Sequence, residues 1–166
     1  MTFIISTKFV AKTIKQKPTM KKNYTAKASI NIYAPVEKVW DALTNPAIIK
    51  KYFFGTNANS NWKVGGELTF TGEYQGKQYQ DKGKILDMDE NRLFKYTYWS
   101  SMSGKDDKPE NYVEITYQLF PDGDMTTLRV TQEGIPNTEM REHSEQNWNM
   151  VLKNLKNLME KQPSET

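Results

Sequence analysis

The sequence has no cysteine and only one histidine in 166 residues. Without cysteine there is neither a disulfide framework nor a thiolate, and a single histidine cannot complete a zinc site built from Cys and His ligands. The chain also lacks any run close to the 18 or more consecutive apolar residues that a membrane-spanning helix requires. We therefore expect no metal site and no membrane span, and we expect the protein to be cytoplasmic.

The motifs of several cofactor and enzyme classes are missing as well. No G-x-G-x-x-G, P-loop or G-x-S-x-G pattern occurs, so the sequence indicates neither a nucleotide cofactor nor a serine hydrolase. Asp87, Asp89 and Asn91 are spaced like the start of an EF-hand loop. However, Arg92 and Tyr98 stand where that loop requires glycine and glutamate, so calcium binding is not expected.

The single histidine, His143, does not indicate catalysis. It lies early in the last predicted helix beside acidic residues, where a solvated or capping role is the more usual one. No motif joins it to a serine and an aspartate in a triad. We expect no cofactor and no catalytic residue, and the sequence favours a binding protein over an enzyme.

Positive charge is scarce outside the N-terminal segment. Residues 1–24 hold six lysines and no acid, which leaves 17 basic against 20 acidic residues in the rest of the chain. Nucleic-acid binding is therefore not expected, because it needs basic residues on the folded domain that meets the phosphates. We expect residues 1–23 to be a basic, disordered extension, with Met20 as the natural start, and residues 163–166 to be a tail. The alternative for the extension is a basic arm that touches membranes or acidic partners.

Aromatic residues, in contrast, are plentiful, with seven Phe, nine Tyr and four Trp. Apolar side chains alternate over residues 26–32, as in a half-buried strand. Helical spacing follows over 36–43, and Asn45-Pro46 separates this helix from a second short one. Gly55 then opens a polar loop.

Strand patterns separated by turns occupy the middle of the chain. We predict strands over 67–74, 77–88, 93–99, 112–119 and 125–132, joined as an antiparallel meander. A helix over 138–161 follows, capped by Asn137 or Thr138, with an apolar stripe from Trp148 to Met159. This helix must cover the concave face of the sheet. The expected fold is one α+β domain over residues 24–162, with six to seven curved antiparallel strands around a long C-terminal helix.

Three stretches of sequence resemble a known family. They are residues 34–46 (APVEKVWDALTNP), 62–70 (WKVGGELTF) and 143–148 (HSEQNW). They resemble the activator of heat shock protein 90 ATPase, C-terminal-domain type, within the START-like or SRPBCC superfamily, whose fold is the helix grip. Asn147 departs from the glycine that the family usually shows. The eukaryotic activator also uses a second, chaperone-binding domain for which this chain has no room, so its activity does not follow from the resemblance.

The helix-grip fold implies a pocket between the sheet and the last helix. Phe54 and Trp62 lie near the loop that rims such a cavity. The other pocket candidates are meander residues and positions on the last helix: Phe70, Tyr79, Asp81, Phe94, Tyr96, Tyr98, Tyr117, Met140, Ser144 and Trp148. The aromatic side chains among them can equally be ordinary core packing.

Asp81 is the one charged candidate. A two-residue turn at Gln75-Gly76 pairs Phe70 with Asp81 and Gly72 with Tyr79, which puts the carboxylate on the inner face. An inward carboxylate must be hydrogen-bonded, paired with a ligand or protonated. A register shifted by one residue would instead put Asp81 in water, and the sequence leaves both registers open.

Three functions are compatible with this pattern. The first is a binder or carrier of a small hydrophobic molecule, which we expect to be a monomer or a weak dimer. The second is a cyclase- or hydrolase-like enzyme, which requires at least two groups among Asp81, His143 and a pocket tyrosine to converge. The third is a module with a chaperone partner, which requires an exposed apolar or charged face.

Overall fold

The structure is a computed structural model that describes residues 24–161. The expectations for residues 1–23, including a start at Met20, and for the tail at 163–166 lie outside the described residues. The described chain forms one sheet and its covering helices.

Seven antiparallel strands form a single curved sheet in the order β1-β7-β6-β5-β4-β3-β2. The predicted meander is confirmed, because each strand from β2 to β7 pairs with the next one along the chain. β1 returns to pair with β7. The strands are β1 (Tyr24–Ile32), β2 (Asn57–Ser60), β3 (Glu67–Tyr74), β4 (Lys77–Asp89), β5 (Leu93–Tyr98), β6 (Val113–Asp122) and β7 (Met125–Ile135).

Two short elements occupy segments that the sequence assigns to loops. β2 lies in the predicted polar loop after Gly55, since its sequence NANS offers only Ala58 as an apolar residue. Ala58 is buried opposite Phe70, so pairing with β3 creates this strand rather than its own pattern. The 3-10 turn η2 (Pro109–Asn111) closes the loop before β6.

The two predicted short helices are α1 (Val36–Thr44) and α2 (Pro46–Tyr52). Asn45 separates them, and its side chain accepts a hydrogen bond from the Ala47 N–H at 3.1 Å. The apolar stripe of α1 faces the core, where Trp40 packs edge-on against Phe94 with ring centroids 6.3 Å apart.

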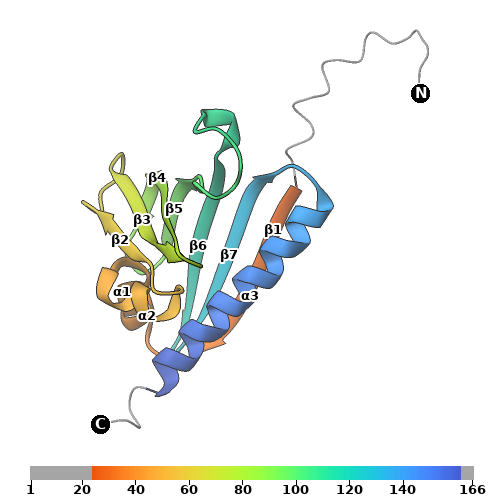
Figure 1. Ribbon diagram of the computed structural model, residues 1–166. Coiled ribbons are helices and arrows are strands. Elements are labelled where there is room, and N and C mark those ends of the chain that lie inside the picture. The colour runs from red at the N-terminus through yellow and green to blue at the C-terminus, as the bar shows by residue number, and fades with distance from the viewer. Residues whose placement is uncertain (1–23, 162–166) are drawn as a thin grey trace, which may run out of the picture.

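The last helix, α3 (Thr138–Lys161), runs along the concave side of the sheet beside β1 and β7 (Figure 1). Asn137 caps it, because its Oδ1 accepts the Met140 N–H at 2.8 Å. The expected stripe is buried from Trp148 to Leu155.

Side chains of α3 also form hydrogen bonds with the backbone of the edge strand β1 and of Tyr33, the residue that follows it. Glu145 accepts the Lys27 N–H at 3.0 Å and Glu160 accepts the Tyr33 N–H at 2.9 Å. Lys156 donates to the Asn31 carbonyl at 2.6 Å. An exposed strand edge otherwise invites pairing with another chain, so these contacts both hold α3 and protect the edge.

The short helices pack at only one end of α3. The Asn154 side chain donates to the Tyr52 carbonyl at 3.4 Å, which ties α2 to the C-terminal half of α3. The N-terminal half has no such helix over it among the described residues (Figure 1). The fold leaves space between that half of α3 and strands β3 to β6, since residues from both sides line a cavity there.

Candidate functional site

A cavity of about 490 Å³ occupies this space, and we call it the aromatic cavity. Eight of its sixteen lining residues are aromatic. Strands β3 to β7, the end of α2 and the N-terminal half of α3 all contribute to its wall. The lining comprises Phe53, Phe54, Thr56, Phe70, Glu73, Tyr74, Tyr79, Asp81, Tyr96, Tyr98, Met102, Ile115, Gln132, Ser144, Asn147 and Trp148.

The β3–β4 hairpin decides where Asp81 points. Gln75 and Gly76 both have positive φ (52° and 82°), the geometry of a two-residue type I′ turn. Phe70 is consequently opposite Asp81, as the inward register predicts, and the one-residue shift does not occur. Asp81 is only 8% exposed and lines the aromatic cavity.

Two donors hold the Asp81 carboxylate. The Tyr98 phenol on β5 donates to Oδ2, and the Ser101 N–H donates to Oδ1 at 3.1 Å. Burial raises the pKa of Tyr98 well above its ordinary value, and the adjacent Asp81 carboxylate raises it further. Tyr98 therefore stays protonated and remains a donor.

A second hydrogen-bonded pair in the cavity wall consists of Tyr79 on β4 and Thr56 in the loop after α2. The Tyr79 hydroxyl donates to Thr56 Oγ1 at 3.0 Å, and Thr56 in turn donates to the Thr71 carbonyl at 3.3 Å. The Tyr79 ring covers Gly72 so closely that a Cβ there would lie 2.5 Å from the Tyr79 hydroxyl. Glycine at position 72 thus makes room for the tyrosine on the cavity wall.

The helix side of the cavity has both an anchor and free polar groups. Trp148 donates its indole N–H to Gln132 Oε1 on β7 at 2.8 Å. Within residues 24–161 the Gln132 amide N–H groups and the Ser144 hydroxyl have no side-chain hydrogen-bond partner. Both side chains are half-buried and available to a bound molecule.

Phe54 stands at the mouth of the cavity because of how α2 ends. The Gly55 N–H bonds the Lys50 carbonyl at 3.1 Å, which is the closing bond of a Schellman motif. Phe54 consequently occupies the left-handed position with φ of 53°, where glycine is usual, and its side chain is 55% exposed. Such backbone strain costs about 1 kcal/mol and is typical of functional sites.

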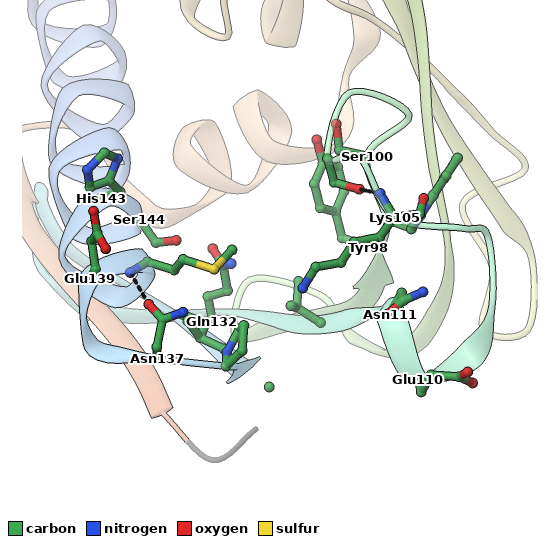
Figure 2. A pocket seen from close by; sticks show the side chains of 17 residues that line it. Tyr98, Ser100, Lys105, Glu110, Asn111, Gln132, Asn137, Glu139, His143 and Ser144 are labelled. Atoms are coloured by element: carbon green, nitrogen blue, oxygen red, sulfur yellow. Dashed lines mark hydrogen bonds between the residues drawn. The ribbon is translucent and has the colours of Figure 1, made fainter. Parts of the chain in front are cut away.

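A second cavity of about 560 Å³, which we call the loop cavity, adjoins the first. Figure 2 shows it between the first turns of α3, with Glu139, His143 and Ser144, and the β5–β6 connection with Ser100 and Lys105. Tyr98, Gln132 and Ser144 line both cavities, so the two are neighbours.

The β5–β6 connection, which contributes lining residues to both cavities, is itself anchored to the sheet. Asp107 pairs with Lys82 at 2.6 Å and accepts the Tyr112 hydroxyl at 2.6 Å. Hydrogen bonds from Lys82 and then from Tyr112 lower the pKa of Asp107. Burial, as the larger cause, and the hydrogen bond to Asp107, as the next, raise the pKa of Tyr112 to about 12.

The structure brings together eight of the twelve predicted pocket residues in the aromatic cavity. These are Phe54, Phe70, Tyr79, Asp81, Tyr96, Tyr98, Ser144 and Trp148. Met140 lines the loop cavity instead, with 43% of its surface exposed.

The other three predicted residues lie elsewhere. Trp62, Phe94 and Tyr117 surround a void of only about 10 Å³ in the core beneath α1 and α2, too small for a ligand. Phe94 and Tyr117 stack with centroids 6.0 Å apart, which is the packing alternative that the sequence left open. Burial raises the pKa of Tyr117 to about 12, so its hydroxyl stays neutral in the core.

Sequence reasoning missed several lining residues. The sequence pattern places Gln132 in a strand without indicating a site, yet it lies opposite Ile115 and accepts the Trp148 indole hydrogen bond at the cavity wall. Met102 comes from the loop after β5, whose path no local pattern indicates. Phe53 also lines the cavity, and its place beside Phe54 in an aromatic pair at the end of α2 is a sequence signal that could have indicated it.

Residues 24–161 contain no helix with both the length and the apolar character needed to cross a membrane. The same range holds no cluster of three or more His, Cys, Asp or Glu side chains placed to bind a metal ion. His143 is exposed on α3 at the loop cavity.

Fold and cavity together define a helix-grip α+β protein, in which a curved antiparallel sheet holds a long C-terminal helix. The chain belongs to the family described as activator of Hsp90 ATPase homolog 1-like protein, whose model matches residues 33–160. The resemblance inferred from sequence is thereby confirmed. A search of curated proteins finds no match.

Solved structures agree with this assignment. The solution structure of ChR145 from Cytophaga hutchinsonii is 41% identical in sequence, with a TM-score of 0.76, over 87% of this chain and 99% of that one. The Aha1 dimer from Colwellia psychrerythraea is 22% identical, with a TM-score of 0.65, over 82% of this chain and 96% of that one. MLL2253 from Mesorhizobium loti is 21% identical, with a TM-score of 0.68, over 83% and 98%. The last two show the fold alone.

Proposed function

We propose that this protein binds or carries a small, largely apolar molecule in the aromatic cavity between the sheet and α3. The observation that carries the proposal is a cavity of about 490 Å³ with half of its lining residues aromatic. Ligand sites generally have this size, with apolar walls and a few convergent polar groups.

The polar groups are few and are held in place. Asp81 and Tyr98 are fixed by their mutual hydrogen bond, and Gln132 is fixed by Trp148. Pre-positioned polar groups of this kind lower the ordering cost of binding. Together with the apolar wall, they suit a molecule with one polar end.

Native mass spectrometry of freshly purified protein tests the proposal. We expect a bound small molecule that is released on unfolding. The matched variants are Ser144→Trp, which fills the space beside both cavities, and Lys153→Trp, on an exposed position of the same helix. Loss of the ligand from the first variant but not the second, with equal helix content, supports the site. Retention of the ligand by Ser144→Trp contradicts it.

A second function, acid–base catalysis, is favoured by one observation. Asp81 and Tyr98 converge in a single cavity, which meets the requirement for at least two candidate groups. Turnover of the molecule identified by mass spectrometry, lost in both Asp81→Asn and Tyr98→Phe, would indicate an enzyme. Unchanged ligand after prolonged incubation would indicate a carrier.

The chaperone alternative has weaker support. The exposed apolar side chains Phe54, Tyr74 and Met102 gather at the mouth of the aromatic cavity, where they serve ligand entry equally well. Stimulation of a chaperone ATPase by the purified protein would favour this alternative.

The Colwellia relative is described as a dimer. We expect this protein to be a monomer or a weak dimer, and light scattering distinguishes these two states.

A further inference from the structure

The charges around the aromatic cavity are of one sign. Its lining includes two carboxylates, Asp81 and Glu73, and no lysine, arginine or histidine. The loop cavity next to it differs, because Lys105 and His143 line it together with two glutamates. The two cavities therefore differ in charge, because only the loop cavity has basic residues in its lining.

Asp81 is buried without a cationic partner. Among the ion pairs of residues 24–161, none includes Asp81, and the adjacent Lys82 is engaged by Asp107. A buried carboxylate normally requires a countercharge or a full set of hydrogen bonds. Each of its oxygens accepts one bond, from Tyr98 or from the Ser101 N–H, although a carboxylate oxygen can accept two. Asp81 can thus accept two further donors from the cavity.

Two aromatic residues, Phe70 and Tyr98, are neighbours of this carboxylate. Phe70 is its cross-strand neighbour, and the Phe70 and Tyr98 ring centroids are 6.0 Å apart. Ring faces attract a cation within about 6 Å, and a carboxylate next to them adds to that attraction. Glu73 lies at the exposed end of the same hairpin, so both charged residues of the lining are acidic.

We propose that the ligand of the aromatic cavity carries a positively charged nitrogen, an ammonium group on an apolar body, and that this nitrogen binds Asp81. The inference rests on the proposed binding function and narrows it to one ligand class. The ammonium donates to Asp81 and lies against the Phe70 and Tyr98 rings, while the apolar body extends toward Trp148. Repulsion by Asp81 and Glu73 weakens the binding of fatty acids and other carboxylates in this cavity.

Three probes of matched shape test the charge requirement. They are 4-phenylbutylamine, 4-phenylbutan-1-ol and 4-phenylbutanoate, titrated into the full chain at pH 7. Calorimetry measures their affinities, and the indole N–H signal of Trp148 in heteronuclear NMR reports binding in this cavity. We expect the amine to bind at least about tenfold more tightly than the alcohol and the carboxylate to bind most weakly.

Two variants test whether the Asp81 carboxylate causes the preference for the amine over the alcohol. Asp81→Asn keeps the shape and removes the charge, and we expect it to abolish the preference for the amine over the alcohol. Asp87→Asn is the matched control, because Asp87 is exposed on the same strand and lines neither cavity, and its preference should equal that of the unmodified protein. If Asp81→Asn does not fold, the three probes on the unmodified chain still decide.

The outcomes separate this inference from the proposed function. If the alcohol or the carboxylate binds as tightly as the amine while the Trp148 signal shifts, the ammonium inference is overturned and the binding function stands. Retention of the amine preference by Asp81→Asn also overturns it. If none of the three probes binds, the ammonium inference is overturned, and native mass spectrometry of the purified protein decides the binding function separately.

Discussion

The Tyr98 phenol on β5 donates a hydrogen bond to the Asp81 carboxylate on β4, inside a cavity whose wall is half aromatic. This hydrogen bond links two strands of the sheet, and it also holds a carboxylate that lines the candidate site. Removing either partner should therefore change stability and ligand recognition together.

Tyr98→Phe should destabilise the protein, because it leaves the buried Asp81 carboxylate with the Ser101 N–H as its only donor. A lost hydrogen bond to a charged group costs about 1.5–3 kcal/mol. Denaturant unfolding measures the change. Tyr74→Phe is the control, since Tyr74 is 58% exposed, and it should change the free energy of unfolding by less than about 0.5 kcal/mol. Equal effects of the two variants would contradict the role of the buried contact.

Gly83→Ala should be far more damaging than Gly72→Ala. A Cβ at position 83 would lie 1.6 Å from the Thr97 carbonyl oxygen, so the β4–β5 backbones would have to separate. A Cβ at position 72 would come closest to the hydroxyl end of the Tyr79 ring, and a side chain can move more readily than the backbone. We expect a loss above about 3 kcal/mol for the first variant and about 1–2 kcal/mol for the second.

Circular dichroism with thermal unfolding compares the two glycine variants. Gly72→Ala should also displace Tyr79 from Thr56, because the hydroxyl can no longer keep its position. A Gly83→Ala protein as stable as the unmodified chain would show that this close approach of the strands does not persist in solution.

Leu155→Ala should cost about 2–5 kcal/mol, since Leu155 is completely buried where α3 meets the sheet. Asn157→Ala, two residues further along on the exposed side, is the control and should be nearly neutral. Differential scanning calorimetry of both variants checks the expectation. Similar melting temperatures would mean that α3 is not packed as described.

Stability should fall on acidification partly through Glu160. Hydrogen bonds from Lys156 and then from the Tyr33 N–H lower its pKa below the ordinary value of 4.5. A carboxyl with a lower pKa in the folded state stabilises the fold above pH 4.5, and this stabilisation is lost as the pH falls through the folded-state pKa. The effect is at most about 1 kcal/mol, because the group is partly exposed.

Glu160→Gln isolates that contribution. Its free energy of unfolding should differ from that of the unmodified protein at pH 7 and converge with it near pH 2. A constant difference across the whole pH range would assign the effect of Glu160→Gln to something other than charge.

The Phe54→Gly variant distinguishes a role of Phe54 in ligand binding at the cavity mouth from a role in the stability of the fold. Glycine relieves the left-handed strain, which offsets its greater entropy in the unfolded chain, so the free energy of unfolding should stay within about 1 kcal/mol. The ring at the mouth is lost, so the bound molecule should dissociate faster. Stopped-flow fluorescence measures that rate, and an unchanged rate would remove Phe54 from the site.

Local patterns in the sequence determined the architecture. The alternation in β1, the Asn45-Pro46 break, the hairpin turn at Gln75-Gly76 and the stripe of α3 each depend on neighbours within a few residues. Period and turn chemistry act at this range, so they can be recognised without the fold. The hairpin even predicted that Asp81 pairs with Phe70, although the alternative register remained open until the turn geometry was known.

The site depended on contacts that no local pattern records. Phe70 and Phe94 look alike in sequence as inward aromatics on the meander, yet one lines the aromatic cavity and the other lies beneath α1. The difference arises because the two short helices pack at only one end of α3. Gln132 meets Trp148, and Tyr98 meets Asp81, only because the sheet curves around that helix and brings distant strands to a common wall. Burial and polar pairing are properties of the assembled fold, so only the tertiary structure could decide which side chains share the cavity.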